Sequence, residues 1–386
     1  MSKLKLGLCI LLVMLVVTGP GCRSGREDFT LFRIIDRLGP ENVVKSPLRK
    51  PDPENAILAE VVGQFPLEDL GAGPNPFLIK KKLHVGAADV NALAAIPPTE
   101  ICFRLKVPSH ARLEFNYGIR HDKEIFRAGG GERRAEFSVI LTSKGREQRI
   151  FKKALILGRV LVFNNKEIDL ARYAGQDVEF RLITEGDGKA LAFWLNPVIF
   201  QVRPDSRYIV LISIDTLRAD HLGCYGYGRD TSPNLDALAR DSVRFDNVMA
   251  SSPWTLPSHM SLMTSLNSIS HGVAAPGYRL NPDVPTLAEL LKTRGFYNVA
   301  ITGGGFVSGF FGFCKGFDSY RALGAVTDSD AAGRLYASAS RWIEDNLEKS
   351  FFLFLHTYQV HNPFDSGEPN NKRYLRSGAA YEKIGT

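Results

Sequence analysis

Two residues combine a side chain that can do chemistry with a position at the end of a predicted element. Asp215 follows the run Tyr208–Ile214, in which five of seven residues are Val, Leu or Ile. An apolar run without alternation is typical of a parallel strand covered on both faces. Ligands of open α/β sheets bind outside the carboxyl ends of strands, and a carboxylate placed there is costly unless it is paired or metal-bound. We therefore expect Asp215 to bind a metal rather than to cap a loop.

Thr255 supplies a hydroxyl at the predicted start of a helix. It lies two residues before Pro257, which signals a helix start, and we expect a helix over residues 258–266. The unpaired N–H groups and the positive dipole end of such a helix favour an anionic ester. With Asp215 nearby, Thr255 predicts metal-assisted nucleophilic attack on a tetrahedral oxyanion. Capping the helix is the alternative role for this threonine.

Several histidines lie close in sequence to these residues or at the end of another predicted strand. His259 is four residues after Thr255, on the same helix face, where it would activate or orient the hydroxyl. A solvent-facing polar residue is the alternative. His356 ends a second apolar run and is expected to be a satisfied structural histidine. Asp220 and His221 follow Asp215 closely, and a loop salt bridge or cap is favoured there over a metal ligand.

The elements that must position these residues alternate between helix and strand. We expect helices over residues 234–240, 286–294 and 330–348, and strands over 296–301 and 350–355. This alternation predicts an α/β fold with a mostly parallel sheet and helices on both faces. We assign it to residues 206–386.

The preceding part of the chain has a different pattern. Period-two alternation occurs in residues 101–107, 112–117, 136–139 and 177–182, with Lys144-Gly145 as a candidate turn. This pattern predicts an antiparallel, jelly-roll-like β-sandwich over residues 101–205. Trp194 is expected in its core rather than in a sugar site. Residues 23–100, which contain many prolines, are expected to form a linker with some local structure.

The N-terminus has the layout of a secretory signal. Lys3 and Lys5 precede an apolar run to Val17, followed by small residues and Cys22. The run is short for a membrane span, and Cys22 after Gly21 resembles a bacterial lipoprotein cleavage site. We expect residues 1–22 to be a lipoprotein-type signal, with the chain exported to the periplasm or cell surface and lipid-anchored at Cys22. Ordinary secretion and an uncleaved anchor are the alternatives.

Composition argues against a nucleic-acid partner and against a disulfide framework. The 386 residues carry a net charge of +7, but no Lys/Arg run is interleaved with aromatic residues, so we expect no nucleic-acid partner. Beyond Cys9 and Cys22 near the N-terminus, the cysteines are Cys102, Cys224 and Cys314, sparse and odd in number, so we expect free thiols rather than a disulfide framework.

Several motifs occur in a family-specific order. The sequences DTLRAD from Asp215, GCYG from Gly223 and SPNLD from Ser232 resemble the N-terminal signature of the sulfatase family, within the alkaline-phosphatase-like superfamily. TLPSH from Thr255 resembles the family's Cys/Ser-x-Pro-x-Arg nucleophile motif, and VHNP from Val360 resembles a later segment whose histidine contacts the ester. The second half of the chain is thereby identified as the N-terminal part of a sulfatase-type catalytic domain. The sandwich loosely resembles carbohydrate-binding jelly rolls.

The resemblance implies hydrolysis of sulfuric or phosphoric esters, with a sulfated glycan as a candidate substrate. It implies that Asp215 and Thr255 bind a divalent metal, that Thr255 is the nucleophile, and that His361 assists the leaving group. The metal would be calcium in a sulfatase-like site, and zinc or manganese in a phosphodiesterase-like one.

The chain departs from the family pattern at several positions. Sulfatases oxidise a Cys or Ser to formylglycine, and Thr255 is not a known substrate for that step. Related phosphodiesterases and phosphoethanolamine transferases use an unmodified threonine, so this chemistry is an alternative. Thr216 replaces a second acidic residue, His259 an arginine, and Gly303-Gly304-Gly305 stands about where a lysine would be.

A further departure concerns the end of the chain. No Asp-Asn/His-Gly motif with further metal ligands follows His361. We therefore expect the chain to hold the first part of the metal site, as in a truncated protein. A non-catalytic chain, either truncated or a binding module, remains an alternative.

Overall fold

The computed structural model describes residues 11–17, 31–45, 80–85, 88–95, 97–120, 134–156, 162–186, 190–323, 330–362 and 373. The chain divides into two compact units, one formed by residues 1–19 and 207–386 and the other by residues 20–206.

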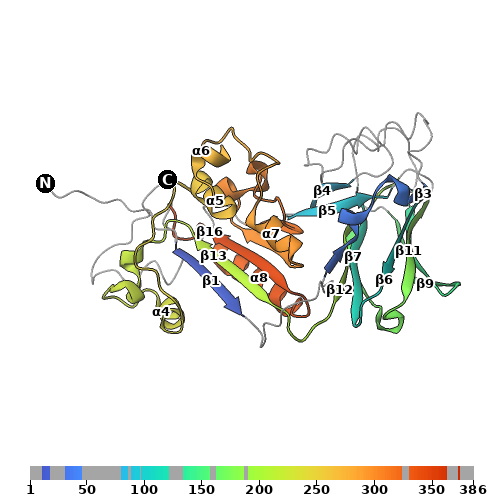
Figure 1. Ribbon diagram of the computed structural model, residues 1–386. Coiled ribbons are helices and arrows are strands. Elements are labelled where there is room, and N and C mark those ends of the chain that lie inside the picture. The colour runs from blue at the N-terminus through green and yellow to red at the C-terminus, as the bar shows by residue number, and fades with distance from the viewer. Residues whose placement is uncertain are drawn as a thin grey trace. The chain divides into compact units, whose positions relative to one another are not determined.

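The first unit contains a mainly parallel sheet in the order β1–β13–β16–β14–β15 (Figure 1). The predicted strand Tyr208–Ile214 is confirmed as β13, beside β14 (Tyr297–Thr302), β15 (Ser319–Ala322) and β16 (Phe351–Thr357). The strands β13, β16, β14 and β15 run parallel, whereas β1 (Leu11–Val17) pairs with β13 in the antiparallel direction. The predicted α/β fold with a mostly parallel sheet is therefore correct.

The helices of this unit cover both faces of the sheet. Helices α5 (Thr255–Thr264) and α7 (Leu287–Thr293) share a core with Phe352 and Phe354 of β16. Helix α8 (Ala331–Glu344) contacts β14 and β16, and its Trp342 packs edge-on against Phe351, which points to the other face. Because side chains alternate along a strand, β16 is buried on both faces. This explains its continuous apolar sequence.

The remaining helical elements of this unit are short. They are α4 (Pro233–Arg240), α6 (Ser268–His271), and the 3-10 turns η4 (Ala219–His221), η5 (Gly223–Tyr225), η6 (Gly305–Val307) and η7 (Gly309–Phe311).

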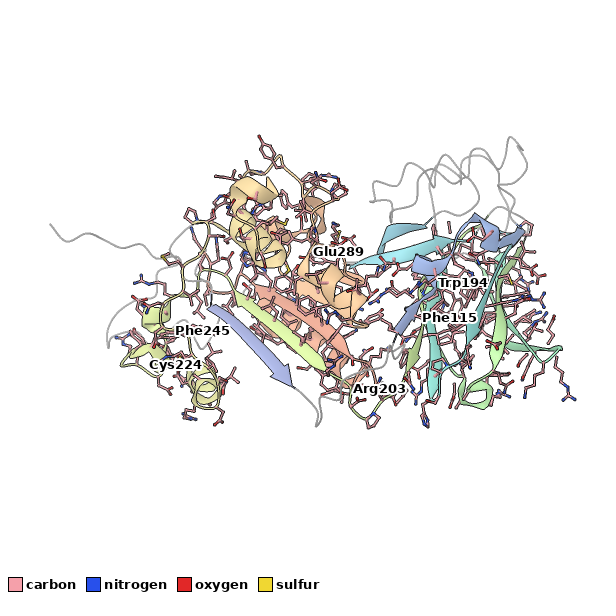
Figure 2. The ribbon with its side chains drawn as sticks, in the orientation of Figure 1. Phe115, Trp194, Arg203, Cys224, Phe245 and Glu289 are labelled. Atoms are coloured by element: carbon pink, nitrogen blue, oxygen red, sulfur yellow. The ribbon has the colours of Figure 1, made fainter. Side chains whose placement is uncertain are left out.

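Two helix boundaries differ from the sequence expectation for identifiable reasons. Helix α5 starts at Thr255 and ends at Thr264, because Ser265 adopts a left-handed conformation with φ 57°. Helix α8 ends at Glu344, and the Asn346 side chain donates to the Trp342 carbonyl in its last turn. Helix α7 begins as predicted, with a capping box between Thr286 and Glu289, which is labelled in Figure 2.

The predicted signal segment falls largely outside the described residues, and so does Cys22. Its apolar run is described as β1, the edge strand against β13. Within the described ranges, no helix combines the length and apolar character needed to cross a membrane.

The second unit is built from two antiparallel sheets. One has the order β5–β12–β7–β10, with β2 added on β12 and β4 on β5, and the other has the order β3–β6–β11–β8–β9. Their bounds are β2 (Leu31–Arg33), β3 (Val43–Lys45), β4 (Lys80–Val85), β5 (Ala88–Ala94), β6 (Thr99–Lys106), β7 (Ala111–Arg120), β8 (Arg134–Ser143), β9 (Arg146–Ile156), β10 (Val162–Asp169), β11 (Asp177–Gly186) and β12 (Leu191–Gln201). The short helical pieces are α1 (Ile34–Arg37), η1 (Pro40–Asn42) and η3 (Ala171–Tyr173). Strands β2 to β5 come from residues that we assigned to a linker.

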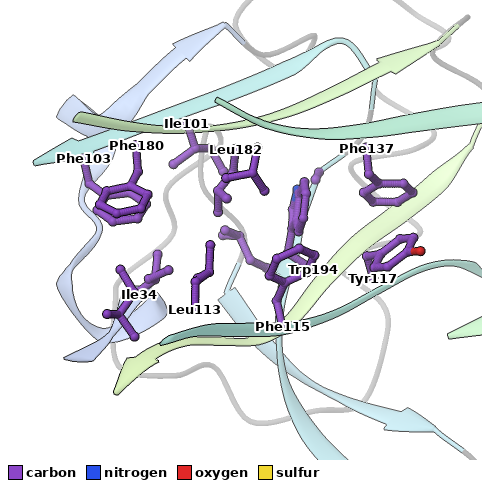
Figure 3. Close-up of a cluster of buried hydrophobic side chains, with 14 of the residues drawn as sticks. Ile34, Ile101, Phe103, Leu113, Phe115, Tyr117, Phe137, Phe180, Leu182 and Trp194 are labelled. Carbon is purple, nitrogen blue, oxygen red and sulfur yellow. The ribbon is translucent and has the colours of Figure 1, made fainter. Parts of the chain in front are cut away.

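The sandwich core combines aliphatic side chains with a cluster of aromatic rings (Figure 3). Trp194 is fully buried, packs edge-on against Phe115 and Phe137, and donates its indole N–H to the Thr184 hydroxyl at 3.1 Å. Its predicted core position is correct, so this ring is not available to stack on a sugar. Lys144 and Gly145 both have positive φ, as a two-residue hairpin turn between β8 and β9 requires.

Candidate active site

The strand register brings the carboxyl ends of three parallel strands together. Ser213 of β13 is opposite His356 of β16, which is in turn opposite Thr302 of β14. Asp215 therefore leaves β13 at the same edge at which His356 ends the apolar run of β16. Its backbone N–H donates to the Thr357 carbonyl at 3.0 Å, and its side chain is 0% exposed.

The chain turns sharply immediately after Asp215. Thr216 has φ 62°, which is strained for a β-branched residue, and its hydroxyl donates to the Val360 carbonyl at 3.0 Å. Strained conformations of this kind persist where the surrounding structure holds them, often at functional sites. The turn thereby fixes the position of the buried Asp215 carboxylate.

Thr255 and Asp215 are joined directly. The Thr255 hydroxyl donates to Oδ2 of Asp215 at 2.7 Å, and both side chains are buried. Thr255 is the first helical residue of α5, whereas Trp254 occupies the N-cap position. Its side chain therefore faces the strand end and does not cap the helix.

His259 is buried, so the solvent-facing alternative is wrong. Its Nδ1 lies 2.9 Å from the Thr255 carbonyl oxygen, and its Nε2 lies 2.8 Å from Oγ of Ser213. Because a carbonyl oxygen can only accept, Nδ1 carries the proton and Nε2 accepts from Ser213. His259 thus contacts the backbone rather than the hydroxyl of Thr255. It ties the first turn of α5 to β13.

His356 differs from the satisfied structural histidine that we expected. It is 0% exposed, and both ring nitrogens lack a hydrogen-bond partner. Its Nε2 lies 4.0 Å from Oδ2 of Asp215, and its ring stands edge-on to His259 at 4.9 Å between centroids. Burial lowers the pKa of His259, and burial together with neighbouring His259 lowers the pKa of His356 well below its ordinary value. Both imidazoles are therefore neutral near pH 7.

Tyr358 completes the enclosure of this edge. Its ring lies 4.5 Å from that of His356 between centroids, and its hydroxyl accepts from the Phe306 N–H at 3.1 Å. Burial and then the charge of Asp215 raise the pKa of Tyr358, so the phenol keeps its proton. Across the Tyr358 ring lies His361, whose Nδ1 is 2.7 Å from the Asn362 carbonyl oxygen. His361 thus reaches the rim of the site without contacting Asp215 or Thr255.

Asp220 and His221 lie apart from this cluster. Asp220 forms a two-bond ion pair with Arg218 and contacts Nδ1 of His221 at 3.0 Å, and the Asp220 and His221 side chains are 61% and 50% exposed. The pKa of the Asp220 carboxyl is lowered, chiefly by its hydrogen bond with Arg218. The loop salt bridge that we favoured is what the structure shows.

The glycine triplet after β14 offers little to an oxyanion. The Gly303 N–H donates to the His356 carbonyl, and the Gly304 N–H donates to the Thr302 hydroxyl. A side chain at position 303 would meet the Tyr358 ring at 2.9 Å, so glycine is needed for this close approach. The triplet therefore packs against His356 and Tyr358 rather than presenting three free amides.

Asp215 is the main residue at this edge that could bind a metal ion. Its Oδ1 is buried without a hydrogen-bond partner, while Oδ2 is engaged by Thr255. A buried carboxylate oxygen in this state is satisfied by a cation. No group of three or more His, Cys, Asp or Glu side chains in the described ranges could hold a metal by itself. The donors at Asp215 and Thr255 thus fit part of a metal site.

Two members of the cluster were missed from the sequence. His356 is the one polar residue that interrupts the apolar run FFLFLH, the same signal that identified Asp215. Ser213 occupies a similar place in β13. We expected His356 to be a structural residue and did not consider Ser213, because the partners of both lie on other elements and are set by the strand register.

Comparisons with known proteins find similarity to sulfatases. The family model described as Sulfatase matches residues 207–383. Arylsulfatase D of Homo sapiens is 33% identical over 99 residues, which cover 23% of this chain and 17% of that protein. An N-acetylglucosamine-6-O-sulfatase of Bacteroides thetaiotaomicron is 28% identical over 93 residues, covering 24% of this chain and 17% of that protein. The chain thus matches less than a fifth of the length of these relatives.

Among solved structures, the phosphonate monoester hydrolase of Agrobacterium radiobacter is 20% identical, with a TM-score of 0.38. The match covers 44% of each chain.

Proposed function

We propose that the chain is a hydrolase of sulfuric or phosphoric esters with Thr255 as its nucleophile, because residues 207–383 match the sulfatase family model. The observation that carries this proposal is the buried 2.7 Å hydrogen bond from the Thr255 hydroxyl to Asp215, at the carboxyl edge of a parallel sheet. A hydroxyl becomes a nucleophile when an adjacent group takes up its proton. Asp215 is placed to do so.

The proposed reaction has two displacement steps. The Thr255 oxygen attacks sulfur or phosphorus as its proton moves to Oδ2 of Asp215, and the bond to the alcohol oxygen breaks. His361 gives a proton to the departing alcohol. A water molecule then cleaves the threonine ester, which restores the hydroxyl and releases sulfate or phosphate. The first turn of α5, tied to β13 through His259, holds the nucleophile in place.

We further propose that Asp215 and Thr255 hold a divalent metal. When bound, such an ion neutralises charge on the ester oxygens and lowers the pKa of a coordinated hydroxyl. Calcium is the ion proposed for sulfate chemistry, and zinc or manganese for phosphate chemistry.

A second candidate reaction is phosphodiester hydrolysis or phosphoethanolamine transfer. The observation that favours it is the unmodified threonine at position 255, whose hydroxyl is already hydrogen-bonded to Asp215. The buried site also lacks the cationic side chains expected at positions 259 and 303, where histidine and glycine stand. The non-catalytic alternative remains as an outcome of the test below.

For the sulfate reaction, we propose a sulfated glycan as the substrate. The name of the N-acetylglucosamine-6-O-sulfatase relative, which acts on a sulfated amino sugar, supports this choice. A glycan substrate also agrees with the proposed location outside the cytoplasmic membrane, with Cys22 as lipid anchor. The intact mass of the mature protein tests that anchor, since no acyl addition at Cys22 would rule it out.

The test compares an aryl sulfate with an aryl phosphodiester, assayed on the purified chain with calcium, zinc or manganese. Thr255→Ala is expected to lower the rate on the preferred substrate by roughly a thousandfold or more, and Thr255→Ser to retain part of it. Thr264→Ala is the matched control, because the same substitution is made on the same helix outside the site. An unchanged rate for Thr255→Ala would exclude this nucleophile. No turnover of either substrate would favour the non-catalytic alternative.

A further inference from the structure

The carboxyl edge of the sheet holds two buried groups whose hydrogen-bonding capacity is unused. They are Oδ1 of Asp215 and the imidazole of His356, which lacks a partner at both nitrogens. Both side chains are 0% exposed. Leaving buried polar atoms unpaired destabilises the fold, and such atoms are usually satisfied by an ion or a water molecule. One ion between them would contact Asp215 and the Nε2 side of His356.

The separation of the two residues is close to that expected for a shared ion. Nε2 of His356 lies 4.0 Å from the nearer Asp215 oxygen, which is too long for a hydrogen bond. Nitrogen and oxygen ligands lie about 2.0–2.2 Å from a zinc ion, so two ligands of one tetrahedral ion are roughly 3.4 Å apart. Binding of an ion would therefore draw the two side chains together by about half an ångström, with Thr255 Oγ bonded to the same carboxylate.

The neighbouring residues leave the His356 ring without another role. His259 is committed to Ser213 and the Thr255 carbonyl, and Tyr358 receives the Phe306 N–H. Their rings, at 4.9 Å and 4.5 Å from that of His356 between centroids, hold it edge-on from both sides. A ring fixed in this way by packing, with its nitrogens unused, is preorganised for a ligand.

We infer that His356 is a ligand of the metal ion held by Asp215, and that this imidazole selects a zinc-class transition metal over calcium. Calcium prefers oxygen donors, whereas imidazole suits zinc and its neighbours. The inference rests on the proposed metal-dependent function and names the ion class for it. Asp215 and His356 are two ligands, and Thr255, water or substrate supply the others.

The first test is spectroscopic and needs no enzymatic turnover. The purified chain is stripped with a chelator and loaded with zinc or cobalt(II). X-ray absorption of the zinc form is expected to show an imidazole in the first coordination shell, and cobalt is expected to give visible d–d bands. His356→Ala should lose the imidazole signal and bind zinc roughly tenfold or more weakly, with calcium binding unchanged.

Controls separate this inference from its alternatives. His221→Ala removes an exposed histidine that pairs with Asp220, and should leave the spectrum and affinity unchanged. His356→Gln and thermal unfolding curves show whether a loss of binding reflects misfolding. Wild-type protein without an imidazole shell, or His356→Ala with wild-type zinc affinity, would overturn the inference and leave a bridging water as the occupant.

A further variant distinguishes failure of the inference from failure of the proposed function. Thr255→Ala removes the nucleophile and one proposed oxygen ligand but leaves Asp215 and His356 in place, so the imidazole signal should persist while hydrolysis is lost. Wild-type protein that shows the imidazole signal but hydrolyses neither substrate would contradict the proposed function alone. Hydrolysis with calcium and without an imidazole shell would contradict the inference alone.

Discussion

Two residues at the end of β13, Asp215 and Thr216, adopt states that lower the stability of the fold. Asp215 is a buried carboxylate that receives one hydrogen bond, from Thr255, and leaves its second oxygen unpaired. Thr216, the next residue, adopts a left-handed conformation that a β-branched side chain disfavours. An unpaired buried oxygen and a strained backbone both lower the stability of the fold. Such features are found mainly at functional sites, where a bound ligand stabilises them.

The substitution Asp215→Asn tests this loss of stability. Asparagine keeps an oxygen that accepts from Thr255 but removes a buried charge. In metal-free protein we expect the free energy of unfolding to rise by about 1–3 kcal/mol. With zinc present the order should reverse, because binding stabilises only the folded form that can hold the ion.

Urea unfolding with and without zinc measures both effects. Asp220→Asn is the matched control, since Asp220 is exposed, and it should change stability by less than about 0.5 kcal/mol. Lower stability of metal-free Asp215→Asn would show that the carboxylate is already well compensated without an ion.

Secondary-structure elements explain which parts of the site could be predicted from the sequence. β13 was predicted residue for residue because an uninterrupted apolar run ending in Asp215 has few other interpretations. Thr255 was found because Pro257 marks a helix start. The role of His356 could not be predicted, because its neighbours Asp215 and His259 come from other elements and meet it through the parallel register. The strands before residue 99 were also missed: β2 and β3 are only three residues long, and the longer β4 and β5 lie in a segment that we had assigned to a linker.

Helices α5 and α6 are joined by a histidine that must be neutral. The Val273 N–H donates to Nδ1 of His271 at 3.0 Å, and Nε2 lies 3.3 Å from the Pro257 carbonyl oxygen. Nδ1 is therefore an acceptor, and Nε2 carries the proton. Burial lowers the pKa of His271 below its ordinary value of 6.5.

This lowered pKa gives the sign of a pH effect. Below the unfolded-state pKa, the unfolded chain binds a proton that the folded chain does not, so stability is complete above about pH 6.5 and falls as the pH decreases. The loss is at most about 1.4 kcal/mol per pH unit for each such histidine. His259 and His356, whose pKa values are also lowered, add to the loss.

The variant His271→Asn isolates the share of this one residue. The asparagine oxygen can still accept from the Val273 N–H but does not titrate. Urea unfolding at about pH 7.5 and about pH 5 should therefore show a smaller stability loss for the variant than for the wild type. An equal loss in both proteins would assign the acid sensitivity to other groups.

At the scale of the whole molecule, the described residues form two hydrophobic cores that share no residue. The sandwich core draws on residues 34–199, and the core of the unit with the parallel sheet draws on residues from 209 to 354. Units with separate cores can unfold in separate transitions. The aromatic cluster around Trp194 belongs to the first core, and the α5-facing side of β16 belongs to the second.

We expect a core truncation in one unit to leave the other unit's transition in place. Phe115→Ala removes a buried ring that contacts Trp194 and Phe151, and should lower the stability of the sandwich by about 3–5 kcal/mol. Phe354→Ala should do the same to the other unit. Fluorescence of Trp194, in a background with the other two tryptophans replaced by phenylalanine, reports on the sandwich, and zinc affinity reports on the second unit. If Phe115→Ala shifted the unfolding of both units equally, the two cores would form one cooperative structure, and the sandwich would be part of what supports the active site.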